Sequence, residues 1–230
     1  MTESCYTIGY MSKILPNKPL LIALYGFPGS GKTYFARQLC ENLHAAHLQG
    51  DRIRNELFAN PQYDKQENNV VSQLMDYMAQ EFLNAGLSVV YDTNAMRGVQ
   101  RHALRDMALK THAQSLLVWL QIDTETSFTR VSKRDRRRAD DKYAKPIDRK
   151  TFDSVVSHMQ NPQNVEDYIV ISGKHTFNAQ LSAVVQKLRE LNLVTSDEAN
   201  NTVVKPGLVN LVPSQMAGRV DMSRRNIVIR

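Results

Sequence analysis

The sequence has few cysteines and no long apolar run, and both absences exclude classes of protein. Its two cysteines, Cys5 and Cys40, lack the spacing of a metal site or a disulfide framework. No apolar stretch approaches the ~18 residues that cross a bilayer. The N-terminus also lacks a basic region followed by an apolar one. We therefore expect a cytoplasmic protein with no membrane partner.

What the sequence does contain is an alternation of short apolar runs and helical patterns. Its 230 residues, 42% of them hydrophobic, suit one α/β domain with flanking segments. The expected strands are 20–24, 46–49, 87–91, 116–122 and 168–171. The expected helices are 32–43, 51–58, 67–85, 99–110, 125–137, 147–159 and 179–191. This order predicts a three-layer α/β/α sandwich with a mainly parallel five-stranded sheet. The domain would span 20–193, between an N-terminal extension (1–19) and a C-terminal tail (194–230).

A phosphate-binding loop follows the first expected strand. The segment 26–33 fits G-x-x-x-x-G-K-[ST] and leads from an apolar strand into a helix. In such a loop the backbone N–H groups and the helix N-terminus surround the phosphates of a nucleotide. The predicted ATP-binding residues are Gly26, Phe27, Pro28, Gly29, Ser30, Gly31, Lys32 and Thr33. Lys32 would bridge the β- and γ-phosphates, and the Thr33 hydroxyl would bind Mg²⁺. The fold class is therefore a P-loop NTPase of the nucleoside-kinase type.

The loop alone does not separate switches, motors and kinases. A guanine-specific switch would carry Asn-Lys-x-Asp, and Asn17-Lys18-Pro19 lacks the aspartate. A hydrolytic ATPase typically places a glutamate after the aspartate that ends its acidic strand, whereas here Asp92 is followed by Thr93 and Asn94. Asp92 would hold Mg²⁺ through water, and nothing beside it is suited to activating water for hydrolysis.

An arginine-rich segment supports the kinase interpretation. Residues 130–150 contain ten basic residues against four acidic ones, which accounts for the whole net charge of +6. Such a cluster indicates a polyanion, either nucleotide phosphate, nucleic acid or both. Within the expected helix, Arg130, Arg134 and Arg137 would share one face. Arginines on a lid (about 130–146) would stabilise a phosphoryl group in transfer and exclude water.

Asp51, just beyond the second strand, is the candidate base. The carboxyl ends of parallel strands face the ligand in such sheets, so this carboxylate would lie near the phosphate-binding loop. It could accept the proton of an attacking hydroxyl, or it could be the N-cap of the following helix. Arg54, one turn along, could bind a phosphate on the acceptor.

These motifs together resemble the polynucleotide 5′-hydroxyl kinases and the related zeta-toxin-like kinases. The matching elements, all in the same order, are Gly50-Asp51-Arg52-Ile53-Arg54, Asp92-Thr93-Asn94, Arg130-Val131-Ser132-Lys133-Arg134 and Lys145-Pro146-Ile147-Asp148. The resemblance implies Asp51 as general base and Arg54 as the ligand of the acceptor's 3′-phosphate. It further implies that Thr93 and Asn94 lie at the acceptor and that Arg130 and Arg134 contact the donor phosphates. No phosphatase motif follows the kinase region.

Three functions follow from these observations. The first is ATP- and Mg²⁺-dependent phosphoryl transfer to a hydroxyl, with the 5′-OH of RNA or DNA as the expected acceptor. The second is a kinase of a small molecule, such as a nucleotide sugar, a sugar acid or an antibiotic, because charge outside the lid is balanced. The third is a non-catalytic ATP-binding regulatory module, against which Lys32, Thr33, Asp51 and the paired arginines argue.

Overall fold

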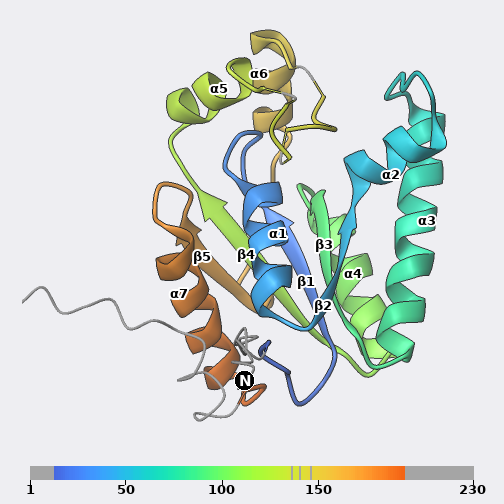
Figure 1. Ribbon diagram of the computed structural model, residues 1–230, viewed down its shortest axis with the longest axis vertical. Helices are drawn as coiled ribbons and strands as arrows, with labels where there is room; N and C mark the ends of the chain where they lie inside the picture. The colour runs from blue at the N-terminus through green and yellow to red at the C-terminus, as the bar shows by residue number, and fades with distance from the viewer. Residues whose placement is uncertain (1–12, 136, 140, 146, 195–230) are drawn as a thin grey trace, which may run out of the picture.

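The computed structural model describes residues 13–135, 137–139, 141–145 and 147–194 and forms three layers (Figure 1). The strands are β1 (Leu20–Tyr25), β2 (Ala45–Gln49), β3 (Ser88–Asn94), β4 (Gln114–Gln121) and β5 (Tyr168–Ser172). The helices are α1 (Lys32–Asn42), α2 (Gly50–Leu57), α3 (Lys65–Asn84), α4 (Gly98–Lys110), α5 (Thr124–Ser132), α6 (Arg149–Ser157) and α7 (Phe177–Glu190). The strand order is β2-β3-β1-β4-β5, and every pair is parallel. The predicted fold class is confirmed.

The central strand β1 is buried on both faces, which explains its unbroken apolar sequence. Its alternate residues Leu20, Ile22 and Leu24 pack into one core with α1 and α7. Leu21, Ala23 and Tyr25 pack into the other core with α3 and α4. Figure 1 shows α1 and α7 in front of the sheet and α4 behind it. The phosphate-binding loop therefore leaves the middle of the molecule at the carboxyl edge of the sheet.

Helix α3 shows how local sequence sets an element's limits. Its buried residues Val71, Met75, Ala79 and Leu83 recur every four positions. The Asp64 side chain accepts a hydrogen bond from the Glu67 N–H and caps the start. Gly86, at φ +81°, ends the helix with its N–H bonded to Leu83 O and that of Leu87 bonded to Phe82 O.

Two predicted boundaries differ from the structure near the site. Strand β3 continues three residues past the predicted end at Tyr91, because Asp92 still pairs with Gln49 of β2. Helix α5 stops at Ser132 instead of Arg137. There the Asp135 carboxylate accepts a hydrogen bond from the Arg137 N–H (3.0 Å), a local bond that competes with helical hydrogen bonding.

Segments outside the predicted domain limits also contact the core. Ile14 is buried, and its backbone bonds to Asn42 O and to the His44 N–H. Asn17 N–H bonds to Leu193 O, so the segment before β1 lies beside the end of α7. The remaining parts of the predicted extension and tail, 1–12 and 195–230, and Pro146 at the lid's end lie outside the described residues. Among the described helices, none is long and apolar enough to cross a membrane.

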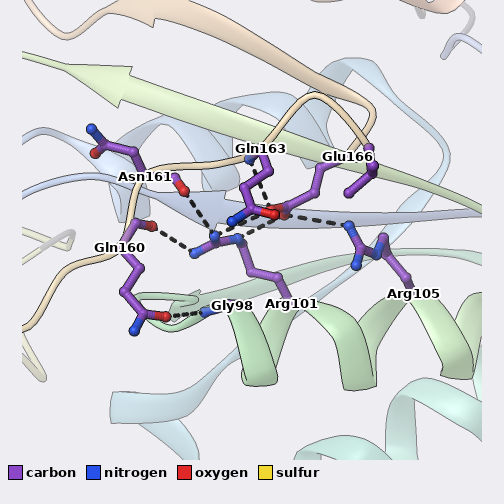
Figure 2. Close-up of a pocket in the computed structure, with 8 residues that line it drawn as sticks. Gly98, Arg101, Arg105, Gln160, Asn161, Gln163 and Glu166 are labelled. Carbon is purple, nitrogen blue, oxygen red and sulfur yellow. Dashed lines mark hydrogen bonds and ion pairs between the residues drawn. The ribbon is translucent and has the colours of Figure 1, made fainter.

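A buried ion pair joins α4 to the segment that leads into β5 (Figure 2). Arg101 donates from Nε to Glu166 Oε2 (2.7 Å) and from Nη2 to Glu166 Oε1 (3.2 Å). Its Nη1 also donates to Ala95 O (3.1 Å) and Gln160 O (2.9 Å). One side chain thus fixes the loop after β3, which begins at Ala95, against the loop before β5.

Replacing Arg101 by Met should destabilise the fold strongly, because Glu166 would stay buried without its main partner. We expect a loss of about 3–5 kcal/mol in the free energy of unfolding, measured by urea denaturation. Arg105→Met is the control, since Arg105 is partly exposed and lies 3.7 Å from Glu166. Equal losses in the two variants would contradict a specific role for Arg101.

Candidate active site

The phosphate-binding loop lies between β1 and α1, where the motif places it. Gly26, Gly29 and Gly31 have φ values of 150°, 88° and 99°. A Cβ on Gly29 would lie 2.4 Å from Ser127 O, and one on Gly26 would lie 2.5 Å from Leu120 O. Both glycines are therefore required by space as well as by backbone conformation. Helix α1 has no acidic residue in its first turn, so its positive N-terminal end is available to an anion.

Lys32 folds back over this loop. Its ammonium donates to Gly26 O (2.8 Å) and Phe27 O (2.9 Å). Burial lowers the pKa of Lys32 to about 8, although the negative charge of Asp92 opposes this shift. The lysine predicted to bind phosphate is thus held in place by backbone carbonyls, and its charge lacks full compensation.

Thr33 and Asp92, the two residues predicted to hold Mg²⁺, contact each other. The Thr33 hydroxyl donates to Asp92 Oδ1 (3.4 Å), and the aspartate is only 6% exposed. Both offer oxygen atoms, which Mg²⁺ prefers. Among the described residues there is no cluster of three or more His, Cys, Asp or Glu side chains for a metal. These two residues therefore suit a cation whose other ligands are phosphate oxygens and water.

His47 is a neighbour of this pair that the sequence analysis missed. Its Nε2 lies 3.0 Å from Asp92 Oδ2, whereas Thr33 contacts the other carboxylate oxygen, Oδ1. The signal was the strand pairing, since Gln49 of β2 lies opposite Asp92 and His47 is its diagonal neighbour on the same face. That pairing requires knowledge of the strand order, so spacing along the chain could not reveal it.

Asp51 lies at the start of α2, next to the carboxyl edge of β2 and β3. The helix begins at Gly50 with Gln49 as its N-cap, so the alternative role of Asp51 as N-cap is wrong. Although the residue is solvent-accessible, protein atoms around its carboxyl remove water and raise its pKa, and the charge of Asp92 raises it further. Arg134, Arg54 and Lys32 oppose the rise, which places all three cations near this carboxylate.

Arg54, predicted to bind the acceptor, forms a buried network within α2 and α3. Its Nη1 donates to Glu67 Oε2 (3.0 Å) and its Nη2 to Asn68 Oδ1 (2.6 Å). The guanidinium also lies over the Tyr63 ring, 4.8 Å from its centroid. Glu67 further accepts hydrogen bonds from the Gln62 and Tyr63 N–H groups (2.7 Å each). Two nitrogens of the Arg54 guanidinium are therefore already bonded within the protein, and a role for Arg54 at the acceptor stays a prediction.

Thr93 and Asn94 end β3 beside the start of α2. Thr93 packs close to Gly50, since a Cβ placed on Gly50 would lie 3.8 Å from the Thr93 Cβ. Asn94 Oδ1 is buried and has no hydrogen-bond partner among the described residues. An enclosed amide oxygen without a donor suits a site that a ligand completes.

The lid arginines point in different directions, which corrects the prediction that Arg130, Arg134 and Arg137 share a helical face. Arg130, on α5, donates from Nη1 to Gly173 O in the loop after β5 (2.9 Å). Arg134 follows the helix, is largely buried and donates to Lys145 O (3.1 Å). Arg137 is 92% exposed and bonds to Asp135. Because α5 ends at Ser132, Arg134 is the one of these three arginines whose charge lowers the pKa values of both Asp51 and Lys32.

Helix α5 is joined directly to the phosphate-binding loop. The buried Ser127 hydroxyl donates to Pro28 O at 2.7 Å. Gly29 packs against the Ser127 backbone, since a Cβ on Gly29 would lie 2.4 Å from Ser127 O. The base of the lid and the loop therefore form one packed unit.

Comparisons with known proteins agree with this arrangement. The family model AAA_33, described as "AAA domain", matches residues 21–162. A putative kinase from Chloroflexus aurantiacus has a TM-score of 0.60 at 16% identity, covering 75% of this chain and 97% of its own. The APS kinase CysC of Mycobacterium tuberculosis, in complex with AMPPNP and APS, has 0.55 at 19%, covering 76% and 99%. Kti12 of Chaetomium thermophilum, in complex with ADP-AlF3, has 0.56 at 14%, also covering 76% and 99%.

At these identities the structural likeness shows the fold. No curated protein matches the sequence significantly. The family match is more specific, because its span runs from β1 to the residues after α6 and so includes the phosphate-binding loop, Asp51, Asp92 and Arg134. The chain therefore belongs to the AAA_33 family of AAA domains and has a P-loop NTPase fold.

Proposed function

We propose that this protein transfers the γ-phosphoryl group of ATP to a hydroxyl group. The observation that carries the proposal is that Lys32 on the phosphate-binding loop and Asp51 at the start of α2 lie at the carboxyl edge of the sheet, and that the charges of Lys32, Arg134 and Asp51 affect one another's pKa values. Two cations beside a phosphate-binding loop suit the donor. A carboxylate within range of both suits a hydroxyl acceptor.

The chemistry assigned to each residue follows from this placement. The acceptor oxygen attacks the γ-phosphorus, its proton passes to Asp51, and the bond from the γ-phosphorus to the oxygen that leaves with ADP breaks. Asp51 is suited to take the proton because desolvation raises its pKa. Lys32 and Arg134 offset negative charge on the transferring group. Mg²⁺, held by Thr33 and through water by Asp92, would neutralise phosphate charge when bound.

The acceptor we favour is the 5′-OH end of a polynucleotide. Support comes from the order of the acceptor and lid motifs and from the excess of basic residues in 130–150. A small-molecule acceptor is the second candidate. It is supported by the printed name of the similar APS kinase and by the bonds that already occupy Arg54.

Asp51→Asn tests the proposed base. It should lower turnover by about 10²–10⁴-fold while ATP affinity stays near that of the unmodified protein, because the amide cannot accept the proton. The measurement is transfer of labelled γ-phosphate to a 5′-OH RNA, a 5′-OH DNA, a 3′-nucleoside monophosphate and a metabolite extract. Asp106→Asn on α4 is the control for the same chemical change away from the site.

The pattern of labelled acceptors separates the two candidates. Label on the oligonucleotides, lost in Asp51→Asn and Lys32→Ala, would support a polynucleotide kinase. Label confined to the extract would support a small-molecule acceptor instead of a polynucleotide. Unchanged turnover in Asp51→Asn would contradict the role of this carboxylate, and no label on any acceptor would favour the regulatory module.

The lowered pKa of Lys32 predicts how ATP affinity changes with pH. Phosphate binding requires the charged ammonium, and the free protein loses that proton above pH 8 instead of near the ordinary 10.5. The Kd for ATP, measured by calorimetry, should therefore rise by about tenfold per pH unit above pH 8. Lys32→Arg keeps its charge and should show no such rise. A Kd that stays constant from pH 7 to 9.5 in the unmodified protein would show that this lysine stays protonated.

A further inference from the structure

The cations of the lid divide into an inner and an outer set. Arg134 and Lys145 form the inner set: the Arg134 side chain is 23% exposed and donates to Lys145 O, and the Lys145 ammonium lies 4.6 Å from the centroid of the Tyr63 ring. The outer set, which we name the outer lid surface, consists of Lys133, Arg137, Arg138 and Lys142. All four residues of this surface are exposed.

The described acidic residues of the same segment leave most of the outer charge uncompensated. Asp141 lies 3.7 Å from the inner Arg134, and Asp135 pairs with Arg137 (3.1 Å). Within the described part of the lid, neither Lys133 nor Lys142 forms an ion pair. Successive turns, from Arg138 N–H to Asp135 O and from Asp141 N–H to Arg138 O, keep this segment compact. A dense group of exposed positive charges results.

Neither the donor nor a small acceptor would contact the positive charges of the outer lid surface. The donor contacts proposed above involve Lys32 and Arg134, and the acceptor hydroxyl must reach Asp51 on the inner side. A small acceptor enclosed there would meet only the inner cations. An acceptor that continues out past the lid edge, marked by the contact between Lys145 and Tyr63, would also meet the outer ones.

We propose that the outer lid surface binds the phosphate backbone of a single-stranded nucleic acid whose 5′ end lies at Asp51. This inference rests on the proposed polynucleotide acceptor. The surface as defined consists of cationic side chains, so it would contact phosphates and not read base sequence. It would raise affinity for longer acceptors and leave the terminal nucleotide to the inner site.

The test reverses two charges on the surface. The Lys133→Glu/Lys142→Glu variant and the matched Lys18→Glu/Lys110→Glu control change net charge equally, and the control lysines are exposed near the opposite edge of the sheet, before β1 and at the end of α4. Binding of a fluorescent 5′-OH RNA 12-mer is measured by anisotropy from 50 to 200 mM salt. Affinity should fall roughly tenfold in the lid variant, and the slope of log K against log salt should decrease by about 1 for each lost contact. The Kd values for ATP and a 3′-nucleoside monophosphate should stay unchanged.

Several results would overturn the inference. These are a lid variant that binds the 12-mer as the unmodified protein does, an equal loss in the control, an equal loss for the 3′-monophosphate, or equal displacement of the RNA by a glutamate 12-mer. Labelling assays separate this inference from the proposed function. If the RNA binds through Lys133 and Lys142 without being phosphorylated, the proposed acceptor fails and the surface stands. If the unmodified protein and the lid variant phosphorylate the RNA with the same KM, the proposed role of the outer lid surface is wrong and the proposed polynucleotide acceptor is supported.

Discussion

The close packing around the phosphate-binding loop is the constraint on which the rest of the site depends. Gly29 lies against the Ser127 backbone of α5. Gly173, in the loop after β5, lies against Ser30, because a Cβ on Gly173 would be 2.5 Å from the Ser30 backbone oxygen. The Ser127 hydroxyl also donates a hydrogen bond to Pro28 O. The loop is therefore in contact with both the lid helix and the last strand's loop, and a change in its shape would shift both. Glycine is required at these positions because the backbones touch.

A second constraint is electrostatic. The phosphate-binding loop and the start of α2 hold two opposite charges, Lys32 and Asp51, that the surrounding protein partly desolvates. Burial lowers the pKa of Lys32, and desolvation raises the pKa of Asp51. Each shift means that the charged form is disfavoured in the protein alone. A polyphosphate would compensate the lysine, and a hydroxyl proton would neutralise the aspartate. The same environment that weakens both charged forms therefore favours the two ligands that a kinase brings together.

The sequence predicts those parts of the fold and site that depend on local pattern. The apolar run of β1, the four-residue spacing in α3 and the glycines and lysine of the loop each indicate their structure within a few residues. Contacts between distant segments are different. His47 meets Asp92 only through the pairing of β2 with β3, and Glu67 meets Arg54 only because α3 packs on α2. Neither neighbour has a signal in its own segment, so strand order and helix packing must be known first.

The early end of α5 shows how one local bond changes what a segment can do. A helix continuing to Arg137 would have placed Arg130, Arg134 and Arg137 on one face, all directed at a single ligand. With the helix ending at Ser132, the chain turns through hydrogen bonds such as that between Arg137 N–H and Asp135, and its cations face two ways. The charge of Arg134 then lowers the pKa of Asp51, while Arg137 is almost fully exposed. Under the proposal made here, such a lid would contact a donor through Arg134 and a long anionic acceptor through its exposed cations, which one helical face could not do.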